Sequence, residues 1–415
     1  MSHTLLARPR IGQTLRVDHA TSRSATYLPG VVGTAGRFPV DVPAAMPLRL
    51  AGQRLLTPGP LRIYTCGITP YDVTHVGHAS TFVWADLTAS LAHATGVEAI
   101  LCRNVTDVDD VLTAAARGRG AHYDDFALTQ EFLFDRDMRA LGVARPTITP
   151  HARGHIRDVQ RLAAALLQTG AAYERGGYVF FRGQGLPARA GLDEQAALEA
   201  SHRFGDQSDV PGRDSPFDVA VWRPSSAEYP AWPSPWGWGR PGWHAECAAM
   251  AMACVGNSVD VLLGGVDLAF PHHEYQSAMA EAASGVVPFA RTVVHVGEVR
   301  LDGAKMAKST QNLVLVGDLL ERHSGAAVRL ALLNRPWDQP WECAETEFTK
   351  ATSVLKQLYA AAGSAADTTA AVEEVLGLLA TELDVPRAIE LALDRGGQAA
   401  RFLIHTLKLR DAPPT

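Results

Sequence analysis

The 415 residues are 47% hydrophobic and 20% charged, which is enough apolar material for a large core and for two or three domains. No apolar stretch reaches the roughly 18 residues that a membrane span requires. The N-terminal segment carries several Arg but lacks the apolar core and cleavage site of a secretory signal. We therefore expect a globular, cytoplasmic protein with no membrane partner, whose first residues form a poorly ordered leader.

The cysteines and the net charge narrow the class further. Five cysteines lie without regular spacing in a long chain, which is typical of a reducing compartment rather than of a disulfide framework. The formal net charge of −6 gives no general attraction to a polyanion, because nucleic-acid binding depends on Lys and Arg. The composition thus argues against tRNA as a partner and favours packing or metal binding for the cysteines.

In chain order, the residues up to about Pro60 contain many Gly and Pro and predict an extended arm. The apolar run 61–66 then predicts a buried strand. The pattern from about 78 to 95 predicts a long helix, and 97–105 predicts a second strand. A strand, a helix and a strand in this order indicate a parallel α/β unit.

Two later apolar runs, 259–265 and 291–301, look like further buried strands of the same sheet, so the stretch from about 125 to 230 is a large insertion. The tail from about Phe348 has helical periodicity. From Trp337 onward it holds twelve Asp or Glu against seven Lys or Arg. The predicted domains are an arm at 1–59, a Rossmann-like domain at 60–124 and 231–336, an insertion at 125–230 and a helical domain at 337–415.

His75-Val76-Gly77-His78 follows the first predicted strand and opens the helix. Backbone N–H groups and the helix dipole favour an anion there, and Gly77 removes a side chain where a nucleotide approaches. The motif therefore suits the phosphates of ATP. By itself the pattern is weak, because two histidines near a helix start are more often surface or capping residues.

Lys305-Met306-Ala307-Lys308-Ser309 lies in a Gly-bearing loop after the last predicted strand. Two mobile ammonium groups there suit the charge that builds up on a pyrophosphate in a transition state. A solvated pair of lysines is the alternative. Because both motifs follow strand ends, where open α/β sheets bind ligands, their pairing favours a nucleotide site.

Cys66, Cys247 and His272 are candidate metal ligands. They lie far apart in the chain, and a buried Cys is usually a small hydrophobe, so spacing alone does not establish a site. If the three converge, two thiolates and an imidazole make a zinc site whose open fourth position admits a ligand.

Five segments, in this order, resemble the cysteinyl-tRNA synthetase superfamily over roughly 60–337. They are CGITPYDVTHVGH from Cys66, NVTDVDD from Asn104, GRPGWHAEC from Gly239, FPHHE from Phe270 and KMAKS from Lys305. Within the superfamily, Ile68, Thr69-Pro70 and the overall length are more similar to the mycothiol cysteine ligases, which join cysteine to glucosaminyl-inositol, than to the tRNA enzymes.

The resemblance implies a Rossmann-like parallel-sheet domain of the class I aminoacyl-tRNA synthetase type, with an inserted α/β segment and a small C-terminal helical domain. It also implies bound zinc and ATP, with Mg²⁺ accompanying the nucleotide. The implied zinc ligands are Cys66, Cys247 and His272, and the implied contacts to the cysteinyl moiety are Thr69 and Trp243. Cys66 also belongs to the implied substrate-binding set, and the implied adenylate contacts are Gly67, Ile68, Thr81, Asn104, Val105, Thr106, Gly265, Val266, Asp267 and Val299.

Some of these residues have structural alternatives, and the chain departs from the family at several positions. Trp243 also suits a core aromatic, and the valines can contribute backbone groups alone. The acidic residues after the second strand suit the ribose or the amino group, or loop capping; they are Asp107, Asp109 and Asp110. The departures are Ala307 for Ser in KMSKS, LGGVD (263–267) for GGGSD, and RFGDQS (203–208) for ERGGDP. Gln276 stands where the tRNA enzymes have a zinc-ligating Glu, and the absence of that Glu agrees with the mycothiol cysteine ligases.

The implied reaction activates L-cysteine with ATP as cysteinyl-AMP, while the side chains of His75, His78, Lys305 and Lys308 stabilise the developing charge. An amine then receives the cysteinyl group, and glucosaminyl-inositol is the expected acceptor. Three alternatives stay open. A cysteinyl-tRNA synthetase is disfavoured by the acidic tail, a paralogue serving another amine in natural-product assembly fits the altered loops, and a non-catalytic binding protein is disfavoured by the retained His, Lys and Cys residues.

Overall fold

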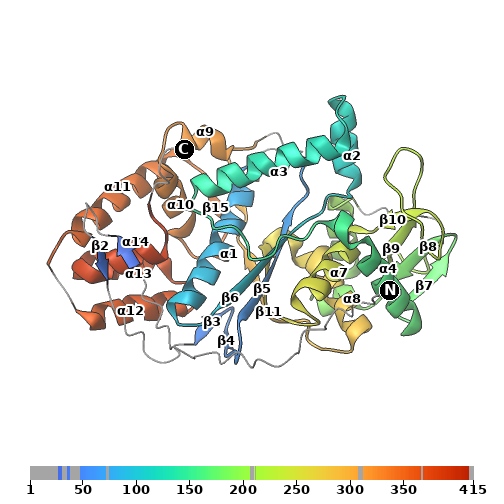
Figure 1. Cartoon of the computed structure of the whole chain (residues 1–415), viewed down its shortest axis with the longest axis horizontal. Helices are drawn as coiled ribbons and strands as arrows, with labels where there is room; N and C mark the ends of the chain where they lie inside the picture. The colour runs from blue at the N-terminus through green and yellow to red at the C-terminus, as the bar shows by residue number, and fades with distance from the viewer. Residues whose placement is uncertain are drawn as a thin grey trace, which may run out of the picture. The chain divides into compact units, whose positions relative to one another are not determined.

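The computed structural model describes residues 27–29, 35–37, 47–71, 74–205, 210, 212–306, 312–365 and 368–410. Strands β1 (Tyr27–Pro29) and β2 (Ala35–Arg37) pair as an antiparallel hairpin within a separate unit, Met1–Asp41. All other elements belong to the second unit, Val42–Thr415, whose chain order follows the colours of Figure 1.

A four-stranded parallel sheet in the order β12-β11-β5-β6 forms the centre of the second unit. Its strands are β5 (Leu61–Ile68), β6 (Ala99–Val105), β11 (Val259–Gly265) and β12 (Ala290–Val296). Helix α1 (Val76–Ala94) packs against β5, β6 and β11, and α7 (Trp243–Val255) packs against β5 and β6. Because helices cover the sheet, β5 and β11 are buried along most of their length, as their continuous apolar runs predicted.

The strand order places a change of direction between β5 and β11. From β5 the chain proceeds through α1 to β6 on one side, whereas β11 and β12 lie on the other. The carboxyl ends of β5 and β11 therefore border the crevice in which such sheets bind ligands. The predicted α/β class is confirmed, and His75–His78 and Gly265–Asp267 follow these two strand ends.

The run 291–301 differs from the prediction that it belongs wholly to the central sheet. Strand β12 ends at Val296, and β13 (Val299–Leu301) joins β14 (Ala304–Lys305) and β15 (Trp341–Glu342) in a sheet of its own. The chain departs at Gly297, where an added Cβ would lie 2.1 Å from the Gln339 carbonyl oxygen. The close approach of a second backbone thus ends the central strand.

A second sheet, antiparallel in the order β10-β9-β8-β7, stands beside α4, α7 and α8. Its strands are β7 (Ala172–Arg175), β8 (Tyr178–Phe181), β9 (Val219–Pro224) and β10 (Gly239–Pro241). The accompanying elements are the hairpin β3 (Leu48–Leu50) and β4 (Gln53–Leu55) and the helices α2 (Asp110–Gly118), α3 (Tyr123–Ala140), α4 (Ile156–Gln168), α5 (Leu186–Arg189), α6 (Glu194–Arg203) and α8 (Glu274–Ser284). One apolar cluster joins this sheet to α7 and α8, while the domain limits given above remain a prediction.

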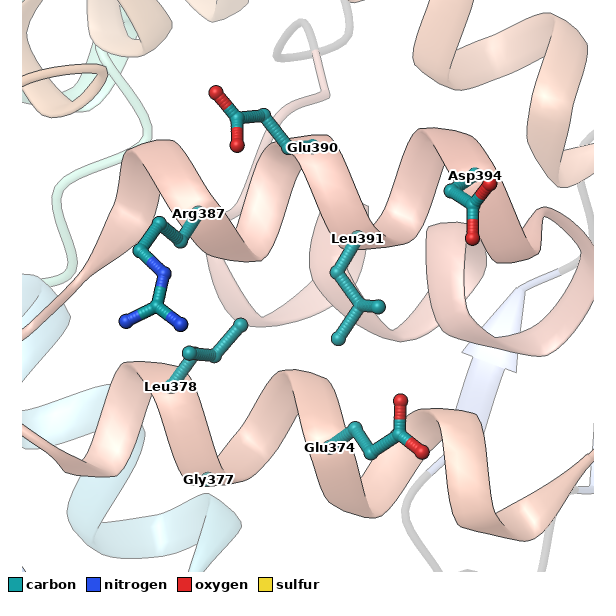
Figure 2. A pocket seen from close by; sticks show the side chains of 7 residues that line it. All are labelled: Glu374, Gly377, Leu378, Arg387, Glu390, Leu391 and Asp394. Carbon is teal, nitrogen blue, oxygen red and sulfur yellow. The ribbon is translucent and has the colours of Figure 1, made fainter.

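The remaining helices are α9 (Val316–Leu320), α10 (Gly325–Leu333), α11 (Glu345–Ala362), α12 (Thr369–Ala380), α13 (Val385–Arg395) and α14 (Gly397–Thr406). The last four, α11 to α14, confirm the helical tail. Between α12 and α13 lies an open groove of about 590 Å³, with Leu378 and Leu391 between charged side chains (Figure 2). No residue predicted for the active site lines it. Among the described helices, none has the length and apolarity needed to cross a membrane.

Candidate active site

Two thiols and an imidazole converge at the carboxyl end of β5. Cys66, Cys247 and His272 each offer one donor atom, and these atoms lie within 4.8 Å of one another in a buried position. The cysteines come from β5 and α7, and the histidine comes from the kinked segment Ala269–His273 that leads into α8. This is a possible metal site formed by three elements that the central sheet brings together.

The chemistry of the three donors fits a soft divalent metal. Nε2 of His272 is buried and has no hydrogen-bond partner among the described residues. Burial lowers the pKa of this imidazole, and His244 and His273 lower it further, so the ring is neutral and keeps a lone pair. Burial and the neighbouring Cys66 raise the pKa of the Cys247 thiol, although hydrogen bonds from Asn104 and Tyr64 oppose this. A bound cation is what favours the thiolate forms there.

Asn104 connects the end of β5 to one of these thiols. Its Nδ2 donates to Cys247 Sγ at 2.9 Å, and its Oδ1 accepts from the Gly67 N–H at 2.6 Å. A Cβ on Gly67 would lie 1.8 Å from the Asn104 carbonyl oxygen, so only glycine allows this approach. The family resemblance implied that Asn104 contacts the adenylate only; nothing in the sequence spacing indicated its contact with a candidate metal ligand.

Gln276 lies at the position where the tRNA enzymes were expected to carry a ligating Glu. The Cys66 thiol donates to Gln276 Oε1 at 3.3 Å, and the amide is fully buried. Its Nε2 has no hydrogen-bond partner in the described part of the chain. The amide thus touches one thiol without supplying a negative charge.

We expect Gln276→Glu protein that has been loaded with zinc to release the metal about tenfold or more slowly than the zinc-loaded unmodified chain. The substitution adds a carboxylate beside a candidate ligand, and changes in groups that touch metal ligands alter metal affinity by that order. Release can be followed with a chromogenic chelator. The isosteric control is Gln160→Glu, since the Gln160 amide donates to the exposed Pro233 carbonyl rather than touching the three donors. Equal release from Gln276→Glu and the unmodified chain would show that residue 276 does not reach the metal.

The side chains implied in holding the cysteinyl group line the same strand end. Thr69 Oγ1 and Thr106 Oγ1 are hydrogen-bonded at 2.7 Å, and the Thr106 N–H donates to the Ile68 carbonyl at 2.9 Å. Val105 pairs with Ile68 across the β5–β6 ladder. The Trp243 ring stacks on His272 with centroids 3.9 Å apart. Trp243 is half-buried, so it borders the cluster rather than the interior of the core.

At the start of α1, His75 is a helix cap. Its Nδ1 accepts from the Gly77 N–H at 3.1 Å, and its ring lies tilted against the exposed His78 ring, with centroids 3.9 Å apart. Burial lowers the pKa of His75 to about 3, and His78 and Lys305 contribute to the same shift. A neutral ring that accepts at Nδ1 carries its proton on Nε2, so His75 can donate one hydrogen bond to an anion.

The second motif approaches the first through Asp267. Lys305 Nζ lies 3.0 Å from Asp267 Oδ2, and the same ammonium is close enough to act on His75. A Cβ on Gly265 would lie 2.5 Å from Asp267 Oδ1 and 3.8 Å from Thr81 Oγ1. The glycine leaves room beside these polar groups for a ligand. The other lysine, Lys308, lies outside the described residues.

The two remaining predicted residues differ in environment. Val266 is 42% exposed beside Asp267, whereas Val299 is buried on β13 and its carbonyl accepts from the Met306 N–H at 2.9 Å. A backbone role therefore suits Val299 better than a side-chain contact.

The three carboxylates after β6 all have structural partners. Asp109 caps α2 by accepting from the Val111 N–H at 2.7 Å. The ion pairs are Asp107 with Arg153 at 3.2 Å, and Asp110 with Arg240 and Arg223 at 3.0 Å each. These carboxylates were expected either to contact the ribose or the amino group of a substrate, or to cap the loop. The contacts present are helix capping and ion pairs.

Comparisons with known proteins agree with this geometry. Residues 53–353 match the family described as tRNA synthetases class I (C) catalytic domain. A cysteine–tRNA ligase of Xanthomonas euvesicatoria is 39% identical over 345 residues, covering 82% of this chain and 70% of that protein. The L-cysteine:1D-myo-inositol 2-amino-2-deoxy-alpha-D-glucopyranoside ligase of Kribbella flavida is 40% identical over 339 residues, covering 80% and 83%.

Solved structures show the same fold at low identity. A leucyl-tRNA synthetase of Agrobacterium radiobacter K84 superposes with a TM-score of 0.61 at 11% identity, covering 86% of this chain and 84% of the other. A methionyl-tRNA synthetase of Mycobacterium tuberculosis gives a TM-score of 0.59 at 15% identity, covering 84% and 88%. The chain therefore belongs to the class I cysteinyl-tRNA synthetase catalytic-domain family of ATP-dependent cysteine ligases.

Proposed function

We propose that this protein activates L-cysteine with ATP at zinc held by Cys66, Cys247 and His272, and transfers the cysteinyl group to the amine of glucosaminyl-inositol. The observation that carries the proposal is the convergence of those three donors beside the nucleotide motifs at the β5 and β11 strand ends. Zinc bound there would supply an open coordination position for a thiolate, which a serine hydroxyl imitates poorly.

Side chains of the protein would position cysteine and ATP for the first step, the formation of the adenylate. Thr69 and Trp243 would hold the cysteinyl part, and Asp267 would orient the ribose. The substrate carboxylate oxygen attacks the α-phosphorus of ATP and expels pyrophosphate, giving cysteinyl-AMP. His75 Nε2–H and the Lys305 ammonium would donate to the phosphate oxygens as their charge grows, joined by His78 and by Lys308.

In the second step, the acceptor nitrogen attacks the activated carbonyl carbon, AMP leaves, and the nitrogen gives up a proton as the amide forms. The acidic surplus from Trp337 onward and the net charge of −6 favour an amino sugar, which carries no negative charge, over a polyanionic tRNA. Relatives named for each acceptor match at similar identity, so the choice rests on charge. The cytoplasm remains the proposed location.

Two assays test the proposal. We expect cysteine-dependent exchange of pyrophosphate into ATP, with serine slower by at least about 10⁴-fold, because a site built to bind one polar group rejects the analogue that cannot bind there. Absence of pyrophosphate exchange with cysteine would contradict the proposal that this protein activates cysteine with ATP. Mass spectrometry of mixtures with glucosaminyl-inositol, bulk tRNA or other amines then identifies the acceptor. A cysteinyl product on any amine other than glucosaminyl-inositol would favour the paralogue, and charged tRNA would favour the synthetase.

A further inference from the structure

Trp243 belongs to a longer aromatic stack that reaches into the insertion. Its indole stacks on His272 at 3.9 Å with 28° between the planes, and Phe204 stacks on the same indole at 5.9 Å and 22°. Phe204 follows α6 as its C-terminal cap residue. The rings of Phe204, Trp243 and His272 come from three separate elements and are therefore linked in series. His272, at the end of the series, is a candidate metal ligand.

The element that carries Phe204 is anchored beside that ligand. Helix α6 packs against the segment Ala269–His273, and its buried alanines join Phe270 and Tyr275 in one apolar cluster. Asp193 caps the start of α6 by accepting from the Ala196 N–H at 2.8 Å. The position of the Phe204 ring is thus set by a helix that is itself packed against the base of the metal-ligand segment.

On its other edge, the His272 ring is held by a polar contact. Its Nδ1 lies 2.8 Å from His244 Nδ1. The imidazole plane is therefore constrained by one hydrogen bond and by the Trp243 face, whereas Trp243 itself is half-buried. A half-buried indole can change rotamer unless a second surface restrains it, and Phe204 provides such a surface.

We propose that Phe204 is a positioning residue for the metal and amino-acid site, which holds the Trp243 indole against His272. The inference rests on the proposed function, because it assigns the stack to zinc retention and to the fit of the cysteine substrate. It predicts that the insertion contributes to amino-acid recognition without touching the reacting atoms.

The test compares Phe204→Ala with Phe204→Tyr, which keeps the ring, and Phe204→Leu, which keeps apolar bulk without it. We expect Phe204→Ala to raise the KM for cysteine about three- to tenfold, the effect of losing one aromatic pair, with kcat and the KM for ATP within about twofold. Zinc release to a chelator should accelerate by a similar factor. Phe204→Tyr should restore both quantities, and Phe204→Leu should not.

Phe132→Ala is the matched control, because this ring on α3 is 68% exposed and should leave both quantities unchanged. A purely structural role would instead lower the unfolding temperature of Phe204→Ala and its active fraction at constant KM. That result would overturn the assignment. So would a KM for cysteine and a rate of zinc release that are both unchanged in Phe204→Ala, or full restoration of both quantities in Phe204→Leu.

The two readouts separate this inference from the proposed function. If the unmodified chain binds zinc but exchanges no pyrophosphate, the proposed function fails and zinc release still decides the role of Phe204. If the unmodified chain exchanges pyrophosphate but retains no zinc, the metal assignment fails and the KM decides. If it does neither, both proposals fail together.

Discussion

Replacing Cys247 with alanine is expected to abolish zinc retention and cysteine-dependent pyrophosphate exchange together. The substitution leaves only Cys66 and His272 of the three converging donors. Zinc affinity should fall by more than about 100-fold, because changes in groups that merely touch metal ligands already cost ten- to hundredfold. Metal analysis after dialysis gives the zinc content, and exchange at saturating ATP gives the activity.

Cys254→Ala is the matched control for this experiment. Cys254 lies on the same helix two turns after Cys247, and its thiol contacts His155 Nε2 at 3.9 Å rather than the metal cluster. It should retain both zinc and exchange. A Cys247→Ala protein that kept both properties would show that the three donors do not hold the metal on which cysteine activation is proposed to depend.

Replacing Arg329 with methionine is expected to lower the free energy of unfolding by about 3–5 kcal/mol, the usual cost of removing one partner of a buried ion pair. Arg329 is fully buried on α10 and pairs with Asp86 of α1 at 2.6 Å. It also donates to the carbonyl oxygens of Leu407 and Leu141. The substitution leaves the Asp86 carboxylate with Lys408 as its remaining charged partner.

Urea unfolding at neutral pH measures this loss. The control is Arg387→Met, because the exposed Arg387–Asp384 pair should contribute no more than about 1 kcal/mol. A loss below 1 kcal/mol for Arg329→Met would show that the buried pair is not required for stability.

The pH dependence of the same pair has a definite sign. Burial by itself would raise the pKa of Asp86, but Arg329 and Lys408 lower it to below its ordinary value of 3.8. A carboxylate whose pKa is lower in the folded state stabilises the fold above its unfolded pKa. The advantage of the unmodified chain over Arg329→Met should therefore be complete at neutral pH and shrink as the pH falls below about 3.8.

Most of the central fold was predictable because its signals are local. The continuous apolar run of β5 and the periodicity of α1 each reflect neighbours within a few residues. The same applies to β6 and β11. The exception, the departure of β13 at Gly297, depends on the Gln339 carbonyl, which lies far along the chain.

The residues of the candidate site also fall into two groups, those that local motifs predicted and those whose contacts depend on tertiary packing. Motif position alone located His75 and Gly77 at a strand end of the central sheet, whereas Lys305, which was predicted to lie in a loop, is on strand β14 of a separate sheet. The hydrogen bond from Asn104 to Cys247 and the stacking of Phe204 on Trp243 had no counterpart in sequence spacing. Each of these contacts joins elements that meet only after the sheet and the insertion have packed.

The amino-acid sequence by itself determined which donors and which strand-end motifs this protein has, because residue type and local periodicity are properties of short segments. Only the tertiary structure decided that Cys66, Cys247 and His272 meet within 4.8 Å and that the Gln276 amide touches the Cys66 thiol. The physical reason is that the three donors are brought together by the parallel order of β5 and β11 and by the packing of α7 on β5.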